Sequence, residues 1–422
     1  MKPAKPLRTE VRRRALATAA ERLRDAQVVV LSGPRAVGKS TVLRTLAAEL
    51  GREVVDLDNP STAQAFTADP MRFLDRPRPV LIDEYAKAPE SLDLVKALLN
   101  RDGSPGQFLL AGSTRYGSVP AIAQALTGRA QIVPVLPLSQ GEITETTESF
   151  VEELVRGRTP ALADSGLDRA AYADRVLRGG MPMALRIAGE GARQRWFDQY
   201  LQLTLDKDVA ELRKVRRRVL MPRLATLVAA RTAQLANTAK LGQELDLDRS
   251  TTEDYLQLLE AVFLHQQLAA WGTTLSARSA ATPKLHFVDT GLAARLLRVT
   301  REQLLAARPQ ALQQFGHLLE TFVVNEIVKQ THWLDEPVAV GHWRTHDGDE
   351  VDLVLERPDG SVIAFEVKAS PNVREEDARG LQALARRVGE DRCTGVILHT
   401  GKHAFRLGGA LALPVASLWQ AD

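Results

Sequence analysis

The sequence predicts an α/β protein with a parallel-sheet core near its N-terminus, a helical middle region and a second α/β domain at its C-terminus. Three observations predict this class. Strand and helix patterns alternate from about residue 26 to 140, as expected for a parallel sheet covered on both faces. The pattern then turns helical to about residue 235. Over the last 110 residues or so, a helix is followed by three strand patterns, a helix and another strand.

Length and composition set the limits of this prediction. A chain of 422 residues with 45% hydrophobic residues has room for two to four domains with sizeable cores. No apolar run approaches eighteen residues, and no apolar core follows the basic N-terminus, so we expect a soluble protein without a membrane span or signal peptide. The single cysteine, Cys393, excludes an internal disulfide and suits the cytoplasm. The net charge of +3 provides no global basic field for nucleic acid.

The first predicted element with chemistry is a glycine-rich loop between an apolar strand, residues 28–31, and a helix. This context is typical of a phosphate-binding P-loop, whose backbone N–H groups surround phosphate oxygens at the N-terminus of a helix. The lysine would reach the β- and γ-phosphates of ATP, and the serine hydroxyl would bind Mg²⁺. The residues predicted to bind the cofactor are Gly33, Pro34, Arg35, Ala36, Val37, Gly38, Lys39, Ser40 and Thr41.

Two acids end the next buried strand pattern, residues 79–82. An acid at this edge of a nucleotide-binding sheet can hold Mg²⁺, and its neighbour can polarise the attacking water. We assign Asp83 to the metal and Glu84 to the water. The alternative is a strand that runs into an acidic turn.

Two further polar residues are candidates for phosphate chemistry. Ser113 follows a buried strand pattern, residues 107–112, and could sense the γ-phosphate or orient water. Arg129 ends a helical segment and could act as an arginine finger on the nucleotide of a neighbouring subunit. The alternative for Arg129 is a surface ion pair.

The helical region contains the strongest local basic cluster and a short helix-turn-helix pattern. The cluster could contact nucleic acid or be a solvated helix face. The helix-turn-helix pattern, residues 235–272, resembles a winged helix. Its second helix exposes four acids and one arginine, so we expect contact with protein or with the chain itself rather than with DNA. The basic residues are Arg213, Lys214, Arg216, Arg217, Arg218 and Arg223, and the four acids are Asp248, Glu253, Asp254 and Glu260.

The C-terminal strands bring a second set of charged residues together. Glu366 and Lys368 point to the same face of one predicted strand, and Asp352 lies on the adjacent strand. Two carboxylates can bind Mg²⁺, and the metal can generate hydroxide near a phosphodiester while a lysine stabilises the developing charge. An ion-paired sheet edge is the alternative.

This order of acids and lysine resembles the PD-(D/E)XK nuclease superfamily. The resemblance implies that Asp352 and Glu366 bind metal, that Lys368 is the catalytic lysine and that Glu320 is an accessory helical acid. Glu350, on the same strand face as Asp352, could share that role. An inherited fold without activity would give the same pattern.

Over nearly its full length, the chain resembles AAA-family ATP-binding proteins with a C-terminal DUF4143 region. The P-loop, the Asp83-Glu84 pair and the 112–113, 126–129 and 137–139 segments carry the resemblance in the first part. Residues 179–182, 255–260 and 283–292 carry it downstream. Ala36 departs from the pattern, because a glutamine is common there. The corresponding fold is an AAA+ P-loop ATPase core (1–145), a helical lid and connector (146–234), a winged-helix-like module (235–275) and a DUF4143-type nuclease-like domain (276–422).

The resemblance also implies an assembly and cofactors. AAA proteins usually work as rings with ATP between neighbours, so we expect ATP and Mg²⁺ as cofactors and a homo-oligomer, most simply a hexamer. Arg129 is then the leading finger, Arg115 its substitute and Arg186 a candidate lid sensor. Three functions remain open: an ATP-driven machine that handles DNA, a nucleotide-regulated metal-dependent nuclease, and a protein-binding ATPase switch.

Overall fold

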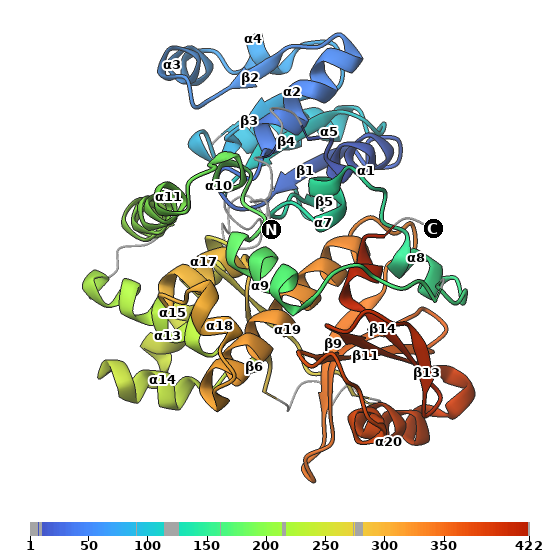
Figure 1. The fold of residues 1–422 in the computed structure, drawn as a ribbon. Coiled ribbons are helices and arrows are strands. Elements are labelled where there is room, and N and C mark those ends of the chain that lie inside the picture. The colour runs from blue at the N-terminus through green and yellow to red at the C-terminus, as the bar shows by residue number, and fades with distance from the viewer. Residues whose placement is uncertain are drawn as a thin grey trace.

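The computed structural model describes residue 7 and residues 11–89, 91–113, 126–160, 162–212, 217–272, 274 and 282–420. A five-stranded parallel sheet in the order β2-β3-β4-β1-β5 forms the N-terminal core. Its strands are β1 (Val28–Ser32), β2 (Val54–Asp56), β3 (Val80–Asp83), β4 (Phe108–Gly112) and β5 (Ala130–Pro134). The helices of this part are α1 (Arg14–Arg22), α2 (Lys39–Leu50), α3 (Pro60–Ala68), α4 (Met71–Leu74) and α5 (Ser91–Arg101). Figure 1 shows them around the sheet in blue and cyan.

Both faces of the central strands β1, β3 and β4 are buried, which explains why these strands are nearly continuous apolar runs. Along β1, Val29 and Leu31 belong to one hydrophobic core, whereas Val28 and Val30 belong to another on the opposite face. The parallel register places Asp83 beside Ala111 and Ser32 beside Gly112. The carboxyl ends of β1, β3 and β4 therefore meet at one edge of the sheet.

The middle region is helical, as the sequence predicts. Two of its helices, α13 and α15, pack against a small antiparallel sheet in the order β6-β8-β7. The helices are α7 (Gln140–Thr144), α8 (Phe150–Val155), α9 (Arg169–Arg178), α10 (Pro182–Arg186), α11 (Glu190–Leu203), α12 (Val209–Leu212), α13 (Met221–Ala230), α14 (Thr238–Leu245) and α15 (Arg249–Ala261), with a π-helical turn, η3 (Thr204–Asp208), between α11 and α12. The strands are β6 (Gln234–Leu235), β7 (His265–Leu268) and β8 (Lys284–Phe287).

This small sheet crosses the domain boundary that the sequence suggests at residue 275. Strand β8 lies beyond that boundary but pairs with both β6 and β7. The hydrogen-bonded unit therefore extends to Phe287. The segment from Arg278 to Pro283, whose sequence suggests a linker, lies mostly outside the described residues.

The C-terminal part contains a mixed six-stranded sheet in the order β13-β14-β12-β11-β10-β9. Strands β9, β10 and β11 are antiparallel, and β12 and β14 continue the sheet parallel to β11. The strands are β9 (Ala339–Arg344), β10 (Glu350–Glu356), β11 (Val362–Lys368), β12 (Cys393–His399), β13 (Phe405–Leu407) and β14 (Ala410–Pro414). The helices are α17 (Thr290–Leu296), α18 (Arg301–Leu305), α19 (Pro309–Thr331) and α20 (Arg379–Val388).

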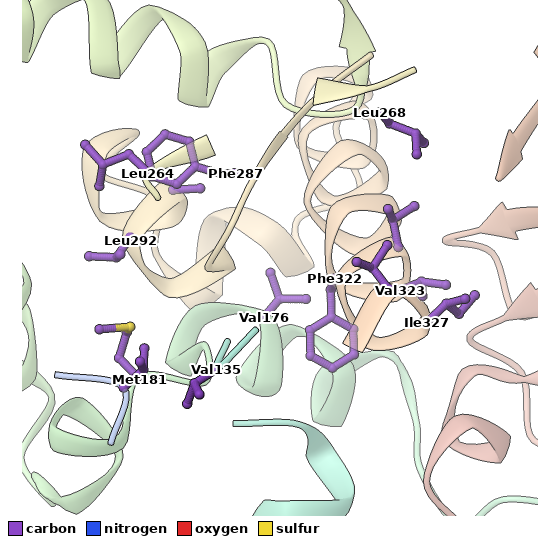
Figure 2. Packing of buried hydrophobic residues seen from close by; sticks show 14 of the residues in the cluster. Val135, Val176, Met181, Leu264, Leu268, Phe287, Leu292, Phe322, Val323 and Ile327 are labelled. Atoms are coloured by element: carbon purple, nitrogen blue, oxygen red, sulfur yellow. The ribbon is translucent and has the colours of Figure 1, made fainter. Parts of the chain in front are cut away.

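Helix α19 connects the parts of the molecule. Residues 321–331 of this helix are all buried, and α19 packs on α8, α9, α18 and β11 (Figure 1). One hydrophobic cluster extends from the parallel sheet through the helical region to the C-terminal sheet. Figure 2 shows members of this cluster from α9, β7, β8, α17 and α19, together with Val135 just after β5. Among the described residues, no helix has the length and apolarity to cross a membrane.

Candidate functional site

The predicted P-loop connects β1 to α2 at the carboxyl edge of the parallel sheet. A Cβ at Gly33 would lie 2.0 Å from the carbonyl oxygen of Val135, so only glycine fits there. Gly38 precedes α2 with a φ of 98°, a conformation that glycine adopts without strain. The N–H groups of the first turn of α2 have no partners within the helix, so they can bind an anion. The loop therefore fits phosphate.

Lys39, the first residue of α2, is folded back onto the loop. Its Nζ donates hydrogen bonds to the carbonyl oxygens of Gly33 (2.9 Å) and Pro34 (2.8 Å). Burial lowers the pKa of Lys39 to about 8, although the nearby carboxylates of Glu84 and Asp83 oppose the change. The ammonium is thus held by neutral acceptors within the loop that would receive the phosphates.

Asp83 and Glu84 lie at the end of β3, beside this loop. Burial raises the pKa of Asp83, and a hydrogen bond from the Ser40 hydroxyl partly offsets it. Burial also raises the pKa of Glu84, whose backbone adopts a left-handed φ of 51°. The Ser113 hydroxyl donates a long hydrogen bond, 3.4 Å, to Glu84 Oε2. Ser40 and Asp83 offer the oxygen ligands that Mg²⁺ prefers, so these residues fit the metal.

At the C-terminal sheet, the structure brings three of the predicted acids around a lysine. The Nζ of Lys284 lies 2.9 Å from Glu320 Oε1, 2.5 Å from Glu350 Oε1 and 3.0 Å from Asp352 Oδ1. The Lys284 side chain is 2% exposed. Burial alone would lower its pKa, but Asp352, Glu320 and Glu350 outweigh burial and raise the pKa above its ordinary value. Lys284 is therefore an ammonium at neutral pH.

Glu366 and Lys368 extend the same pocket, whose volume is about 590 Å³. The Nζ of Lys368 lies 2.8 Å from Glu366 Oε1 and 3.5 Å from Asp377 Oδ1. Burial and the charge of Asp352 raise the pKa of Glu366 to about 8, although Lys368 opposes the change. The residues predicted to form a nuclease site thus share one pocket, but each of the four is ion-paired.

The acids of this pocket do not fit a catalytic metal ion. Asp352 uses one carboxylate oxygen for Lys284 and accepts a hydrogen bond from the Val367 N–H, at 2.9 Å, with the other. A divalent ion bound there would lie next to the Lys284 ammonium. Among the described residues, no group of three or more His, Cys, Asp or Glu side chains has an arrangement that could hold a metal ion.

Comparison with known protein families identifies both ends of the chain. Residues 25–144 match the AAA domain, and residues 315–418 match a domain of unknown function, DUF4143. The chain contains an AAA domain and a C-terminal DUF4143 region. Residues 169–303 match a further domain of unknown function, DUF8612, which contains the whole β6-β8-β7 sheet. The first domain, with its parallel sheet and P-loop, is an AAA-type ATPase core.

Two mycobacterial proteins resemble the chain over most of its length. Uncharacterized proteins of Mycobacterium bovis and Mycobacterium tuberculosis are each 28% identical over 400 residues, which cover 94% of this chain and 81% of the relative. Among solved structures, a Walker-type ATPase of Pyrococcus abyssi is 17% identical and covers 71% of this chain and 99% of its own, with a TM-score of 0.38. The Thermotoga maritima RuvB Holliday junction branch migration motor is 17% identical, and the match covers 60% of this chain and 87% of the motor, with a TM-score of 0.29.

A buried arginine that the sequence analysis did not single out, Arg13, holds the P-loop of the AAA domain in place through hydrogen bonds to backbone carbonyl groups. Arg13 donates hydrogen bonds to the carbonyl oxygen of Val37 in the loop and, at 2.6 Å, to that of Leu136. Its Nε lies 3.0 Å from Glu142 Oε1. The Arg13 side chain is 7% exposed. The position of the loop thus depends on an arginine from just before α1.

The same network continues from the AAA domain into the DUF4143 region. The N–H of Gln140, at the start of α7, donates to Glu326 Oε2 of α19 at 2.7 Å. Lys329 of α19 donates to Glu326, at 2.6 Å, and to the carbonyl oxygen of Leu138, at 3.1 Å. Buried charged groups therefore join α19 to the end of the ATPase core.

Helix α11 and its π-helical extension also contact the P-loop. Asp208 Oδ1 lies 2.7 Å from Arg35 Nε, and the Tyr200 hydroxyl donates to the carbonyl oxygen of Arg35 at 3.4 Å. Short π-helical turns are frequent at functional sites. The sequence predicts Arg35 as a loop residue, but its partner Asp208 lies far along the chain and carries no recognisable sequence signal.

The predicted arginines have different outcomes. Arg129, just before β5, donates to Asn100 Oδ1 (2.6 Å) and to the carbonyl oxygen of Lys96 (3.2 Å), which ties it to α5 of its own chain. Arg186 ends α10, where its Nη1 lies 3.9 Å from the sulfur of Met183. Arg115 lies outside the described residues.

The two charged surfaces of the helical region are only partly described. In the basic cluster, Arg217 donates to the carbonyl oxygen of Asp246, at 2.8 Å, and Arg218 lies 3.9 Å from Asp206. Arg223 is exposed. Arg213, Lys214 and Arg216 lie outside the described residues. On α15, Asp248 caps the helix by accepting the Thr251 N–H, and Arg249 pairs with Glu253 at 2.7 Å.

Proposed function

We propose that this AAA-domain protein is a Mg²⁺-dependent ATP hydrolase that works as a homo-oligomer, a hexameric ring, and couples ATP turnover to the handling of DNA. The observation that supports the hydrolase is the meeting of Lys39, the Ser40–Asp83 pair and Glu84 at one edge of the parallel sheet. These are the groups that phosphoryl transfer to water requires.

Each residue has a definite part in this reaction. Lys39 leaves the carbonyl oxygens of the loop and binds the β- and γ-phosphates. Ser40 and Asp83 would hold Mg²⁺, which when bound neutralises charge on the phosphates. Glu84 orients the attacking water and accepts its proton, and its raised pKa suits a proton acceptor. Ser113 fixes Glu84 through their hydrogen bond.

In the ring, Arg129 serves the nucleotide of the neighbouring subunit. An arginine supplied across an interface stabilises the charge that develops on the transferred phosphoryl group. The exposed hydrogen bonds of Arg129 to α5 can be exchanged for phosphate when a neighbour docks. Arg186, after the glycine-proline turn, is the proposed lid sensor.

ATP turnover reaches the rest of the chain through the buried network below the loop. Arg13 contacts the P-loop and Glu142, and the Gln140 N–H contacts Glu326 of α19. A shift of the loop on phosphate binding therefore moves groups that are bonded to the DUF4143 region. The exposed arginines near η3 and α13, such as Arg223, are the proposed DNA contacts.

A protein-binding ATPase switch is the second candidate. The acids Glu253 and Asp254 on α15 disfavour contact with phosphates and favour a protein partner. The metal-dependent nuclease is disfavoured, because Lys284 engages Glu320, Glu350 and Asp352.

The test is ATP hydrolysis by the purified chain without DNA and with single-stranded, duplex and four-way-junction DNA. Lys39→Ala provides the blank. Turnover above the blank establishes the hydrolase, and stimulation by one DNA form establishes DNA handling. Turnover that ignores every DNA form would transfer support to the protein-binding switch, and turnover equal to the blank would contradict the hydrolase itself.

A further inference from the structure

The pocket at the C-terminal sheet contains its own cation. Lys284 comes from β8 of the small antiparallel sheet, whereas its partners Glu320, Glu350 and Asp352 come from α19 and β10. The three N–O distances, 2.5 to 3.0 Å, are those of charge-assisted hydrogen bonds. A lysine has three N–H donors, so three carboxylates satisfy this ammonium completely.

The acids, in turn, have little left to offer a metal. Both oxygens of Asp352 are engaged, one by Lys284 and one by the Val367 N–H. Glu350 also pairs with Arg344, at 3.3 Å, and Glu366 pairs with Lys368 through Oε1, which leaves Glu366 Oε2 as a buried oxygen without a hydrogen-bond partner. A divalent ion would have to displace these partners and then lie beside a second positive charge.

We propose that Lys284 is the permanent cation of this pocket and occupies the place that a divalent metal would need. The pocket is then a metal-free ionic cluster that ties β8 to α19 and β10. Removal of the ammonium leaves a buried set of carboxylates around an empty space, which is the donor set of a cation site. Loss of Lys284 should therefore create metal binding that the natural chain lacks.

The experiment is a calorimetric titration of the full chain with Mn²⁺ in the absence of nucleotide. Asp83→Asn is present throughout to remove the metal ligand of the P-loop site. We expect no binding up to about 1 mM, the weak end of protein cation sites. Adding Lys284→Ala should produce one site that is at least about tenfold tighter, and adding Asp352→Asn should abolish it. Lys240→Ala is the matched control, because Lys240 lines the same pocket but is exposed.

Two results would overturn the proposal. One is Mn²⁺ binding by the Asp83→Asn chain that disappears with Asp352→Asn, since the ammonium would then not exclude the metal. The other is a folded Lys284→Ala chain, verified by circular dichroism, that gains no site. If Lys284→Ala does not fold, Lys284→Gln, which keeps most of the volume without the charge, replaces it. The Asp83→Asn chain with and without Asp352→Asn still decides the first result. None of these readouts depends on ATP hydrolysis.

Discussion

Two lysines of this protein lie close to carboxylates, Lys39 in the P-loop and Lys284 in the pocket at the C-terminal sheet. Their hydrogen-bond partners differ, and this difference decides which of the two sites can bind a ligand. Lys39 donates to two neutral carbonyl oxygens, and its pKa falls to about 8. Lys284 donates to three carboxylates, and its pKa rises. Both ammonium groups are buried. The two lysines therefore differ in the interactions that each would give up if its side chain moved.

Lys39 gives up only carbonyl contacts when it turns to phosphate, and it leaves Asp83 and Glu84 available for metal and water. Lys284 cannot move without leaving three acids uncompensated in a buried pocket. The first arrangement permits exchange of a ligand, whereas the second holds segments together. Carboxylates and a lysine in one pocket are therefore insufficient evidence for catalysis. Whether the lysine is ion-paired with those carboxylates decides whether the acids are available for a metal ion or water.

The largest expected effect is on ATP turnover, and it is seen by comparing one glutamate from each site, Glu84 and Glu366. Glu84→Gln should lower ATP turnover by roughly 10³-fold, because the amide cannot accept the proton of water. ATP binding should persist. Glu366→Gln should leave turnover within about twofold, because Glu366 faces Lys368 rather than a nucleotide. Steady-state ATPase assays on both variants make the comparison, and a large loss in Glu366→Gln would break it.

The second effect concerns stability. Lys284→Ala should lower the free energy of unfolding by about 3–5 kcal/mol, because it strips the cation from a buried cluster. Lys39→Ala should change it by less than about 1 kcal/mol, since the fold disfavours that ammonium and gains only carbonyl contacts from it. Urea denaturation of the two variants measures the difference. Equal losses in both would show that Lys284 does not tie β8 to α19 and β10.

The third effect tests the support below the P-loop. Arg13→Ala should raise the KM for ATP by roughly tenfold, because Val37 and Leu136 lose a shared donor and the loop loses its fixed position. Arg12→Ala is the matched control, as the adjacent arginine is exposed. Initial rates over a range of ATP concentrations provide the readout. Identical KM values for the two variants would show that Arg13 does not position the P-loop.

The smallest expected effect is the uptake of a proton by Lys39 when ATP binds. Near pH 8 Lys39 is about half protonated in the free chain, and contact with phosphate raises its pKa, so ATP binding should take up about half a proton. At pH 6 the lysine is already charged, and its uptake should vanish. Calorimetry in buffers of different ionisation enthalpy measures the uptake, with Lys39→Ala as reference. Uptake that is the same in this variant would assign the proton to another group.

The sequence predicted the elements that are local and missed the partners that are remote. A strand, a glycine-rich loop and a helix stand in one short segment, so the P-loop could be recognised from residues 28–46. Four strands of the C-terminal sheet, β9 to β12, were predicted to within one or two residues of their observed bounds, whereas β13 and β14 were not predicted. These patterns depend on neighbours along the chain.

Contacts between distant segments could not be predicted in this way. Arg13 and Glu142 are 129 residues apart, and Lys284 and Asp352 are 68 residues apart. Arg13 stands in a basic run that looks like a solvated end, and Lys284 opens a strand without any sign of acidic partners. Their roles depend on burial and on the packing of β8 and α19, which only the folded chain provides.

The most direct test of the central claim counts the metal ions that the natural chain binds. Mn²⁺ titrations with and without a non-hydrolysable ATP analogue separate the two sites. We expect one Mn²⁺ per chain with the analogue and none without it, with binding lost in Asp83→Asn and unchanged in Asp352→Asn. A metal ion that binds without nucleotide and is lost in Asp352→Asn would contradict the distinction between the two lysines.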